Sequence, residues 1–538
     1  MKRTVVIPAA GLGARLGDFT KNYSKAMCTL GKKPIISHII EKFDDNDEII
    51  ILTGYKGNLL KECVESCHPN KNIRFVDVDV FEGPGSGLGY SLHCAYEFLQ
   101  KPFIFWSCDT ITEKFDLDSV SYDTNWMVAG TSHTEYFDNY RHIRVNDKNE
   151  VREILPKLIK PSKGVFCYTG IAFIKDYKEF WETYGQGFIE NGEAYGLTNL
   201  SNIKAYFIED WIDTGNRTIF EEAKHVFSSR MEEVILEKPD EAIWFIDNRV
   251  IKFHISEKFI ADRVERFKTL LTEKQNNAGI LLPKILSHNA HTYVYQRADG
   301  EIASKGITAS KMLDIISRYL DNIETVELTD EEKIAIYRDF YLDKTVSRIK
   351  KYCADFSDID KDDVYINGVK CQSAQRLVET INWEQLALEG VFTNNYHGDF
   401  HLENILVDGD KYIMLDWRQN FGKTMVGDAY YDIAKMWHSL IVNHNMVHAD
   451  LFSVENISPN EVIIDIHRTF IDCECEKALV EYLLHSDYSF RQADLMTAII
   501  FLNIAACHIY PYSKFLFNLG KYMINICYKN YSDKFWTL

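Results

Sequence analysis

Residues 396–407 read YHGDFHLENILV and residues 412–417 read YIMLDW, and together they have the residue types of a phosphoryl-transfer site. Transfer of a γ-phosphoryl group needs a carboxylate that orients the attacking hydroxyl and oxygen ligands that hold Mg²⁺ on the nucleotide. Asp399 is a base-type carboxylate, Asn404 follows it by five positions, and Asp416 ends an apolar segment. Ordinary turns also use Gly and Asp, but four polar residues at this spacing favour the catalytic interpretation; they are His397, Asp399, Asn404 and Asp416.

This pattern resembles the aminoglycoside phosphotransferase and choline kinase family, whose HGD-x4-N loop and following strand-terminal Asp match these positions. The segment GDAYYDIAKMWHSLIV resembles the GD-x3-D-[LI]-A-K helix of the same family. The resemblance implies a two-lobed, protein-kinase-like α+β domain in which Asp399 is catalytic and Asn404 and Asp416 bind Mg²⁺. Two alternatives stay open for Asp428 and Asp432: they brace the loop by hydrogen bonds, or they are N-terminal helix acids that the helix dipole favours.

A small lobe is predicted ahead of this loop, beginning with a hairpin in EAIWFIDNRVIKFHI that turns at Asp247 and Asn248. Lys252 lies in its second strand, where the resemblance implies the lysine that binds the ATP phosphates. Glu265, in the next helix, is the candidate acid that orients Lys252, as in the Lys–Glu pair of protein kinases. The alternative for Lys252 is an outward-facing strand lysine. No glycine-rich loop precedes it.

Aromatic residues are frequent in the C-terminal half, where helical patterns dominate. Trp417, Tyr430, Tyr431 and Trp437 either form a cage for a quaternary ammonium by cation–π attraction or belong to the core.

The chain opens with a second nucleotide signature, MKRTVVIPAAGLGARLGDFTKNYSKAM. An apolar strand leads through Gly11 and Gly13 into a basic loop that contains Arg15 and Lys25. Glycines let backbone N–H groups approach phosphate oxygens closely, and the two cations would neutralise a triphosphate. GLGARL lacks the GxGxxG spacing of a Rossmann fingerprint.

This opening resembles the sugar-phosphate nucleotidylyltransferases, including the phosphocholine cytidylyltransferases of bacterial surface biosynthesis. The resemblance implies that Arg15 and Lys25 are catalytic and that two carboxylates hold Mg²⁺. Asp109 in FIFWSCDT and Asp213 in YFIEDWIDTGN are the candidates, because ligands lie beyond the carboxyl ends of the strands of an open sheet. Each could instead cap a helix. The implied nucleotide-binding residues of the first loop are Ala10, Gly11 and Gly13.

Two later segments extend the same resemblance. EGPGSGLGYSL resembles the small-residue loop that contacts the base, although it could be only a tight connection. The base-binding candidates are Gly85, Ser86 and Gly87. In VFCYTGIAF, Gly170 would make room for the acceptor, and either Lys157 or Lys160 would bind its phosphate; the sequence leaves that choice open.

Composition fits two enzyme domains. The chain has 538 residues, of which 46% are hydrophobic, enough for more than one core. The net charge of −19 argues against a nucleic-acid partner. Twelve cysteines without a paired framework, and an N-terminus unlike a signal peptide, indicate a cytoplasmic protein. The apolar stretch from Ala498 is too short for a membrane span and predicts a buried helix.

Strands alternate with amphipathic helices in the first part of the chain and predict an α/β, Rossmann-like, mainly parallel sheet. The predicted domains are a nucleotidylyltransferase at residues 1–235 and a kinase-like phosphotransferase at residues 236–538. The second comprises a small lobe at about 240–300 and a helical lobe at about 305–538.

The two halves fit consecutive chemistry, because a kinase makes the phosphomonoester that a nucleotidylyltransferase consumes. The predicted partners are ATP, CTP or another NTP, and a small alcohol or sugar with its phosphate. The alternatives are UTP or dTTP with a hexose 1-phosphate, unrelated substrates for the two halves, or a regulatory pseudokinase half. An oligomer is compatible with the sequence.

Overall fold

The computed structural model describes residues 2–131, 134–157, 160, 162–182, 186–229, 240–268, 270 and 278–536. The chain divides into two compact units. The first comprises Met1–Ile260 and Ile285–Gln296, and the second comprises Ala261–Lys284 and Arg297–Leu538. The predicted boundary between residues 235 and 236 lies outside the described residues and stays a prediction.

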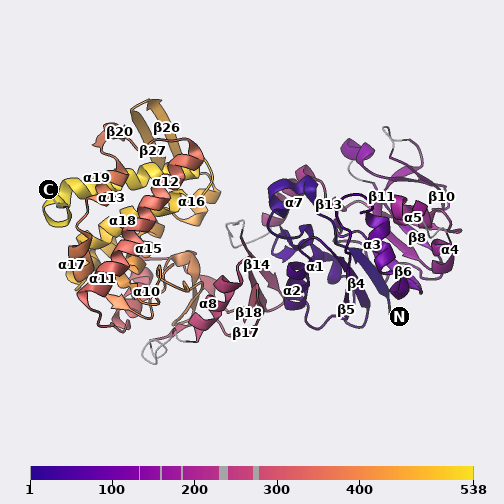
Figure 1. The fold of residues 1–538 in the computed structure, drawn as a ribbon, viewed down its shortest axis with the longest axis horizontal. Coiled ribbons are helices and arrows are strands. Elements are labelled where there is room, and N and C mark those ends of the chain that lie inside the picture. Colours follow the sequence, from indigo (N-terminus) through magenta and orange to yellow (C-terminus); the bar gives the residue numbers. More distant parts are fainter. Residues whose placement is uncertain are drawn as a thin grey trace. The chain divides into compact units, whose positions relative to one another are not determined.

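A nine-stranded sheet is the framework of the first unit (Figure 1). Its strand order is β10-β9-β11-β6-β1-β4-β5, and β8 pairs with both β11 and β12. Strands β5, β4, β1 and β6 run parallel, whereas β11 is antiparallel to β6, β8 and β9. The bounds are β1 (Thr4–Pro8), β4 (Glu48–Thr53), β5 (Ile73–Asp77), β6 (Phe103–Trp106), β8 (Trp126–Gly130), β9 (His142–Val145), β10 (Val151–Leu155), β11 (Val165–Ile174) and β12 (Lys204–Ile208). The predicted α/β class is confirmed.

Both faces of this sheet are covered. Along β1, Val5 and Ile7 belong to one hydrophobic cluster and Val6 to another, as expected for a strand that is buried on both sides. The first cluster includes residues of α1 (Ile35–Ile40), α2 (Gly57–Cys67) and α7 (Arg217–Ser228). The second includes residues of α3 (Leu88–Cys94), α4 (Tyr177–Trp181), α5 (Gln186–Asn191) and α6 (Glu193–Leu197).

A four-stranded antiparallel sheet from the predicted small lobe also belongs to the first unit. It comprises β14 (Glu241–Ile246), β15 (Arg249–His254), β18 (Thr292–Gln296) and β17 (Ile285–His288), in that order. The predicted turn at Asp247 and Asn248 is confirmed. Trp244 and Ile251 lie in the same cluster as α1 and α2, and Arg249 donates hydrogen bonds to two carbonyl oxygens at the end of α2. The two sheets therefore share a core.

Helices dominate the second unit. Helices α18 and α19 pack together, α15 packs against α18, and all 13 residues of α15 are buried. The first part of the apolar stretch that begins at Ala498 lies in α18 and is largely buried, as predicted. Its end lies beyond α18, where Ile509 and Tyr510 are exposed, so the predicted buried helix does not extend over the whole stretch. The bounds are α8 (Glu257–Phe267), which begins in the first unit, α10 (Ala309–Asp321), α11 (Asp330–Tyr337), α12 (Lys344–Phe356), α13 (Ala374–Glu379), α14 (Trp383–Leu388), α15 (Ala429–Ile441), α16 (His444–His448), α17 (Phe470–His485), α18 (Phe490–Ala505) and α19 (Tyr512–Phe535).

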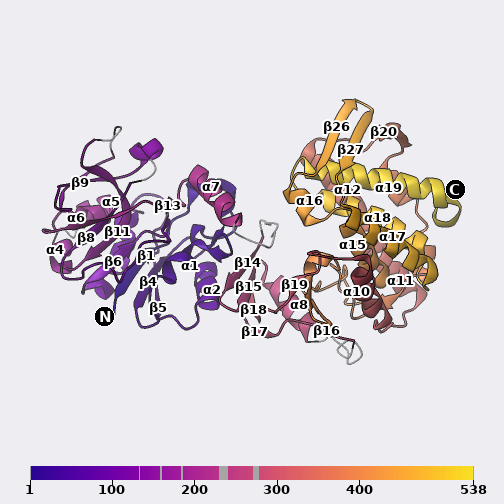
Figure 2. The same ribbon diagram turned by 180° about the vertical axis from the view of Figure 1, so that it is seen from behind.

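Small sheets complete the second unit. One has the order β16 (Ile280–Leu281), β24 (Lys411–Met414), β23 (Ile405–Asp408), β19 (Glu301–Ile302), and β23 and β24 form a hairpin. Another comprises β21 (Val369–Cys371), β20 (Val364–Ile366), β27 (Glu461–Ile466) and β26 (Phe452–Ser458), and Figure 2 shows β20, β26 and β27 projecting from the helices of this unit. Among the described residues, no helix is both long and apolar enough to cross a membrane.

Candidate active sites

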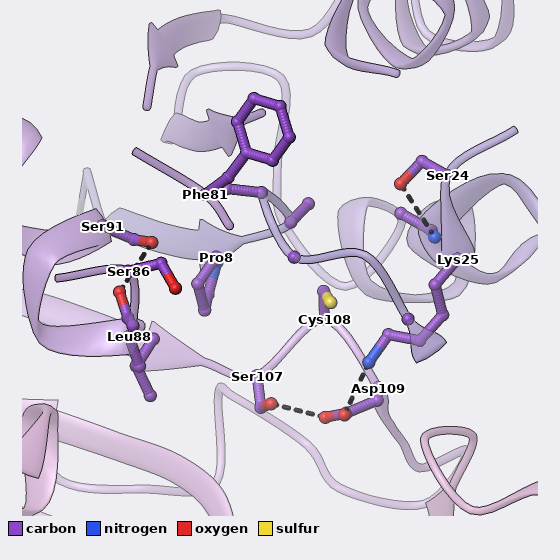
Figure 3. Close-up of a pocket in the computed structure, with 16 residues that line it drawn as sticks. Pro8, Ser24, Lys25, Phe81, Ser86, Leu88, Ser91, Ser107, Cys108 and Asp109 are labelled. Atoms are coloured by element: carbon purple, nitrogen blue, oxygen red, sulfur yellow. Dashed lines mark hydrogen bonds and ion pairs between the residues drawn. The ribbon is translucent and has the colours of Figure 1, made fainter. Parts of the chain in front are cut away.

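The first candidate site is a cavity of about 250 Å³ at the carboxyl ends of β1 and β6 (Figure 3). Its lining includes Ala10, Gly11, Gly13, Lys25, Ser86, Gly87 and Asp109. Arg15 lines an adjoining cavity that shares Lys25 and Ser86 with the first. Gly85 precedes Ser86 in the same loop, with a φ of 86°. The structure thus brings together predicted residues from three separate loops.

Gly13 shapes the loop that follows β1. Its φ of 66° is in the left-handed region, which favours glycine. A Cβ atom there would lie 2.9 Å from Thr20 Cγ2 and 3.0 Å from Lys25 Cβ. Glycine therefore permits both the turn and the close approach of Lys25.

Lys25 and Asp109 form an ion pair at the floor of the cavity (Figure 3). Lys25 Nζ lies 2.7 Å from Asp109 Oδ2, and the side chains are 14% and 19% exposed. Burial opposes ionisation of Asp109, but Lys25 and the Ser107 hydroxyl lower its pKa to about 2. Burial likewise disfavours charged Lys25, yet Asp109 raises its pKa above the ordinary value. Both groups are therefore charged at neutral pH.

Asp213 meets Asp109 beside Gly215. Strand β13 (Ile212–Asp213) pairs with β7 (Thr110–Ile111), which places Asp213 opposite Thr110. A Cβ atom at Gly215 would lie 2.6 Å from Asp109 Oδ2 and 2.9 Å from Asp213 Oδ1. Burial, and then the charge of Asp109, raise the pKa of Asp213. The two carboxylates thus converge on one point, where a cation would relieve their repulsion.

The contacts of the predicted acceptor-binding residues define their side of the site less closely than those of Lys25 and Asp109 define the metal side. Gly170 has a φ of 82°, and its carbonyl oxygen accepts a hydrogen bond from Ser107 N at 2.9 Å. A Cβ atom there would come 2.8 Å from Ser107 Cβ, so glycine lets β11 approach the loop of Asp109. Lys157 and Lys160 are both exposed. Their roles, and that of Gly170 towards an acceptor, stay predictions.

Sequence reasoning missed two residues near this site. The Ser107 hydroxyl donates a hydrogen bond to Asp109 Oδ1 at 2.5 Å, and its position two residues before a strand-terminal Asp was a usable signal. Glu193 is buried at the start of α6, and burial raises its pKa to about 7. The charge of Asp109 adds to this rise, but no sequence spacing connects the two residues.

The second candidate site centres on Asp399. Lys435 Nζ lies 2.7 Å from Asp399 Oδ1, and Asn404 Nδ2 donates a hydrogen bond to Asp399 Oδ2 at 3.2 Å. His401 Nε2 is 3.4 Å from Asp399 Oδ2. Burial alone would raise the pKa of Asp399, but Lys435 and His401 hold it well below its ordinary value. Asp399 is therefore ionised, as a group that orients an acceptor hydroxyl must be. Lys435 was not singled out from the sequence.

A hairpin brings Asn404 and Asp416 to the same end of a small sheet. Strands β23 and β24 pair with Ile405 opposite Met414, and Leu415 N donates to Asn404 O at 2.8 Å. Asp416 has a left-handed φ of 57°, a conformation that is uncommon outside glycine and is enriched at functional sites. Arg263 Nη1 lies 3.6 Å from Asp416 Oδ1.

Helix α15 supports the loop of Asp399 through Asp432. Its carboxylate accepts hydrogen bonds from His397 N at 2.8 Å and from Gly398 N at 2.6 Å. Asp428 instead caps the helix and accepts from Tyr430 N at 3.2 Å. Asp432 thus takes the bracing role and Asp428 the role of an acid at the helix N-terminus, which were the two alternatives left open by the sequence. Burial raises the pKa of both carboxyls to about 6.

Lys252 and Glu265 belong to different units. Lys252 is a half-buried residue of β15 in the first unit. Glu265, on α8 in the second unit, is exposed and lies 2.6 Å from Lys268 Nζ. The ATP-binding roles of Lys252 and Glu265 stay predictions.

The aromatic residues considered for a cage lie in the core. Trp417, Tyr430, Tyr431 and Trp437 are 0%, 3%, 6% and 4% exposed. Trp437 Nε1 donates to Glu476 at 2.9 Å, and the Tyr430 hydroxyl accepts from Ser489 N at 2.8 Å. The core alternative therefore holds for this set.

Both candidate sites contain side-chain oxygens of the kind that bind magnesium. Among the described residues, no group of three or more His, Cys, Asp or Glu side chains is arranged to hold a metal. Mg²⁺ takes oxygen ligands and is commonly bound by one or two carboxylates with substrate phosphates. Asp109 with Asp213, and Asn404 with Asp416, supply such partial sets.

Comparison with known families identifies two regions of the chain. Residues 5–116 match the MobA-like NTP transferase domain, and residues 267–450 match the phosphotransferase enzyme family.

Curated relatives match the first part of the chain. The bifunctional protein GlmU of Methanococcus vannielii is 27% identical over 153 residues, which are 28% of this chain and 34% of that protein. The choline-phosphate cytidylyltransferase of Streptococcus pneumoniae is 28% identical over 177 residues, 31% of this chain and 68% of that protein. This chain thus spans about a third of the length of that GlmU relative. A solved UDP-glucose pyrophosphorylase complexed with UDP-glucose is 18% identical, with a TM-score of 0.36, and covers 43% of this chain and 100% of its own.

Proposed function

We propose that this chain, which joins a MobA-like NTP transferase domain to a phosphotransferase-family domain, catalyses two consecutive reactions on one small alcohol. The phosphotransferase domain would phosphorylate the alcohol with ATP. The NTP transferase domain would then join the phosphomonoester to a nucleotidyl group. The observation that carries this proposal is the presence of two separate carboxylate sites, around Asp399 and around Asp109, on one chain.

In the first reaction, Asp399 accepts a hydrogen bond from the acceptor hydroxyl and then its proton. The hydroxyl oxygen forms a bond to the γ-phosphorus of ATP, and the bond from that phosphorus to the bridging oxygen breaks to release ADP. Lys435 keeps Asp399 ionised, and Asp432 holds the loop by its backbone. Asn404 and Asp416 would hold Mg²⁺, which neutralises the phosphate charge when bound.

In the second reaction, a phosphomonoester oxygen attacks the α-phosphorus of the NTP, and pyrophosphate leaves. Lys25 and Arg15 would offset charge on the triphosphate and on the incoming phosphate, and Gly11 and Gly13 leave the loop backbone open to phosphate. Asp109 and Asp213 would hold Mg²⁺, which stabilises charge at the α-phosphate when bound.

We infer that CTP is the nucleotide of the second reaction. The similarity to a choline-phosphate cytidylyltransferase supports this choice. UTP or dTTP with a hexose 1-phosphate is the second candidate, supported by similarity to the UTP–glucose-1-phosphate uridylyltransferase of Escherichia coli, which is 26% identical over 155 residues. A CDP-activated alcohol is a suitable donor for attachment to a surface polysaccharide. A regulatory pseudokinase is the weaker alternative, because Asp399, Asn404 and Asp416 are all present.

Two substitutions in the full chain test the two-site proposal. Asp399→Asn should abolish ADP release from ATP and the alcohol while leaving pyrophosphate release from NTP and a supplied phosphomonoester unchanged. Asp109→Ala should have the opposite effect. If either variant, correctly folded by circular dichroism, lost both reactions, the two-site proposal would be wrong.

A further inference from the structure

One group of cationic side chains, here called the cationic cluster, comprises Lys344, Arg348, Arg418 and Lys435, and the charges of the other three act on Lys344. Lys435 contacts Asp399 directly at 2.7 Å. Lys344 Nζ lies 3.8 Å from the centroid of the Phe340 ring and 5.7 Å from that of Tyr431. The guanidinium carbon of Arg418 lies 5.7 Å and 5.5 Å from the same two centroids. Two cations therefore share one aromatic surface next to the catalytic group.

Among the described residues, most of the cluster has no ion-pair partner within 4.0 Å, although the charges of Asp399 and Asp432 act on Arg418. Within the described part of the chain, Lys435 is the member of the cluster with a carboxylate oxygen within 4.0 Å, and Lys344, Arg348 and Arg418 have none. Arg348 instead contacts Cys507 Sγ at 2.9 Å. All four side chains are buried or half-buried. Burying unpaired charge is costly, so such a set is favoured where a ligand supplies the missing anion.

The local backbone geometry supports a functional role for this aromatic surface. Residues Arg338–Asp343 form a π-helical segment between α11 and α12, and Phe340 lies within it. Such segments are rare in proteins and frequently occur at functional sites. Phe340 stacks on Phe421 with centroids 3.5 Å apart, so the aromatic surface is held from a second element. Burial and the cations Arg418, Arg348 and Lys435 lower the pKa of Lys344 to about 6, and a bound anion would oppose that effect.

We propose that the acceptor of the kinase reaction is a small alcohol that carries its own anionic group, a carboxylate or a phosphate, and that Lys344 and Arg418 bind this group. This inference rests on the proposed kinase function and narrows its substrate class. A quaternary ammonium would be repelled here, because the guanidinium of Arg418 already lies against the Phe340 and Tyr431 rings near Asp399. The hydroxyl of the alcohol faces Asp399, loses its proton there and forms the bond to the γ-phosphorus as ADP leaves.

The anion at the cluster has two conceivable sources, the acceptor itself or the phosphoryl group in transfer. ADP release from ATP, measured with the full chain and Mg²⁺, distinguishes them when glycerate, glycerol 3-phosphate, glycerol and choline are compared as acceptors. We expect kcat/KM for at least one anionic acceptor to exceed that for glycerol by about 10- to 100-fold, the range of one or two charged hydrogen bonds, with choline lower still. A preference for glycerol or choline would overturn the inference while leaving the kinase function intact.

Variants of the cluster complete the test. Lys344→Gln should raise KM for the anionic acceptor by about 10-fold or more and leave KM for ATP unchanged. Lys344→Glu should reverse the ranking in favour of choline. Lys350→Gln, which alters an exposed lysine on the same helix, is the matched control and should change neither value. Circular dichroism and thermal unfolding of the full chain verify folding in every variant.

Two outcomes would count against the inference in different ways. An equal loss of turnover for charged and uncharged acceptors in Lys344→Gln would assign the cluster to the phosphoryl group in transfer and overturn the proposed acceptor class. Absence of ADP release with every acceptor, in folded protein that still releases pyrophosphate, would overturn the kinase function itself.

Discussion

Gly215 is the residue at which the geometry of the first site is most sensitive to change. A methyl group there would come within 3 Å of carboxylate oxygens of both Asp109 and Asp213. We therefore predict that Gly215→Ala lowers nucleotidyl transfer by roughly 100-fold or more, because the carboxylates must separate from the point on which they converge. Pyrophosphate release measures the loss. ADP release by the same variant is the control, and an unchanged rate of nucleotidyl transfer would contradict the metal-site assignment.

The lowered pKa of Lys344 predicts that the stability of the folded protein depends on pH. Its pKa in the folded protein, about 6, is below the ordinary value of 10.5, so the unfolded chain binds more protons between these values. The free energy of unfolding therefore gains a contribution that rises with pH across this window. The charged groups that act on Lys344 are Arg418, Arg348 and Lys435, with the Cys507 thiol as a weak opposing group.

Lys344→Met should remove this contribution. We expect the variant to have a higher melting temperature than the parent near the lower end of the window and a similar one near its upper end. Thermal unfolding followed by circular dichroism at both ends measures the difference, with Lys350→Met as the control. A constant difference at all pH values would mean that Lys344 does not titrate in this window.

The residues that could be predicted from the sequence are those with local spacing. Asp399 and Asn404 lie in one short loop, and Asp416 follows at the end of the next hairpin. Glu193 gains its importance from a partner far along the chain, Asp109, which no local pattern connects to it. Lys435 is the lysine of the GD-x3-D-[LI]-A-K match, but that match did not indicate its ion pair with Asp399. The sequence could not decide between a cage and the core for the aromatic residues Trp417, Tyr430, Tyr431 and Trp437. Residue types show hydrophobicity and charge, but they do not show which side chains are buried in the core.

At the scale of elements, the β14–β15 hairpin is local in sequence but not in its packing. Alternating apolar residues and a two-residue turn predicted it. Its place beside α1 and α2 could not be predicted, because the contacts join it to residues near the start of the chain. Truncating the chain at the predicted boundary before residue 236 would remove the hairpin, and with it part of the hydrophobic core of the first unit.

Trp244 tests that shared core. It is fully buried in the cluster formed with α1 and α2, and its Nε1 donates to Thr29 Oγ1 at 3.0 Å. Trp244→Ala should destabilise the first unit by about 3–5 kcal/mol, the usual effect of truncating a large aromatic residue in a core. Thermal inactivation of nucleotidyl transfer measures the loss. Leu286→Ala, at a position 46% exposed in the same sheet, should alter stability by no more than about 0.5 kcal/mol. Equal effects would exclude a shared core.

At the scale of the whole molecule, one chain joins a MobA-like NTP transferase domain to a phosphotransferase-family domain. The α/β and helical classes of the two parts followed from strand–helix alternation and helical periodicity. The division of the chain into its two compact units could not be predicted in the same way. The four-stranded sheet that the sequence placed in the kinase half belongs to the first unit. Lys252 is part of that sheet, and its role in binding ATP stays a prediction.

Phosphorus NMR of one reaction mixture examines both steps together. The full chain would be incubated with Mg²⁺, ATP, CTP and glycerate, an alcohol that bears a carboxylate and no phosphate. We expect ADP and pyrophosphate to form in equal amounts, and a new pair of coupled diphosphate resonances to appear that requires both ATP and CTP. Accumulation of a phosphomonoester while CTP, UTP and dTTP each remain unconsumed, or diphosphate formation that does not need ATP, would contradict consecutive reactions on one substrate.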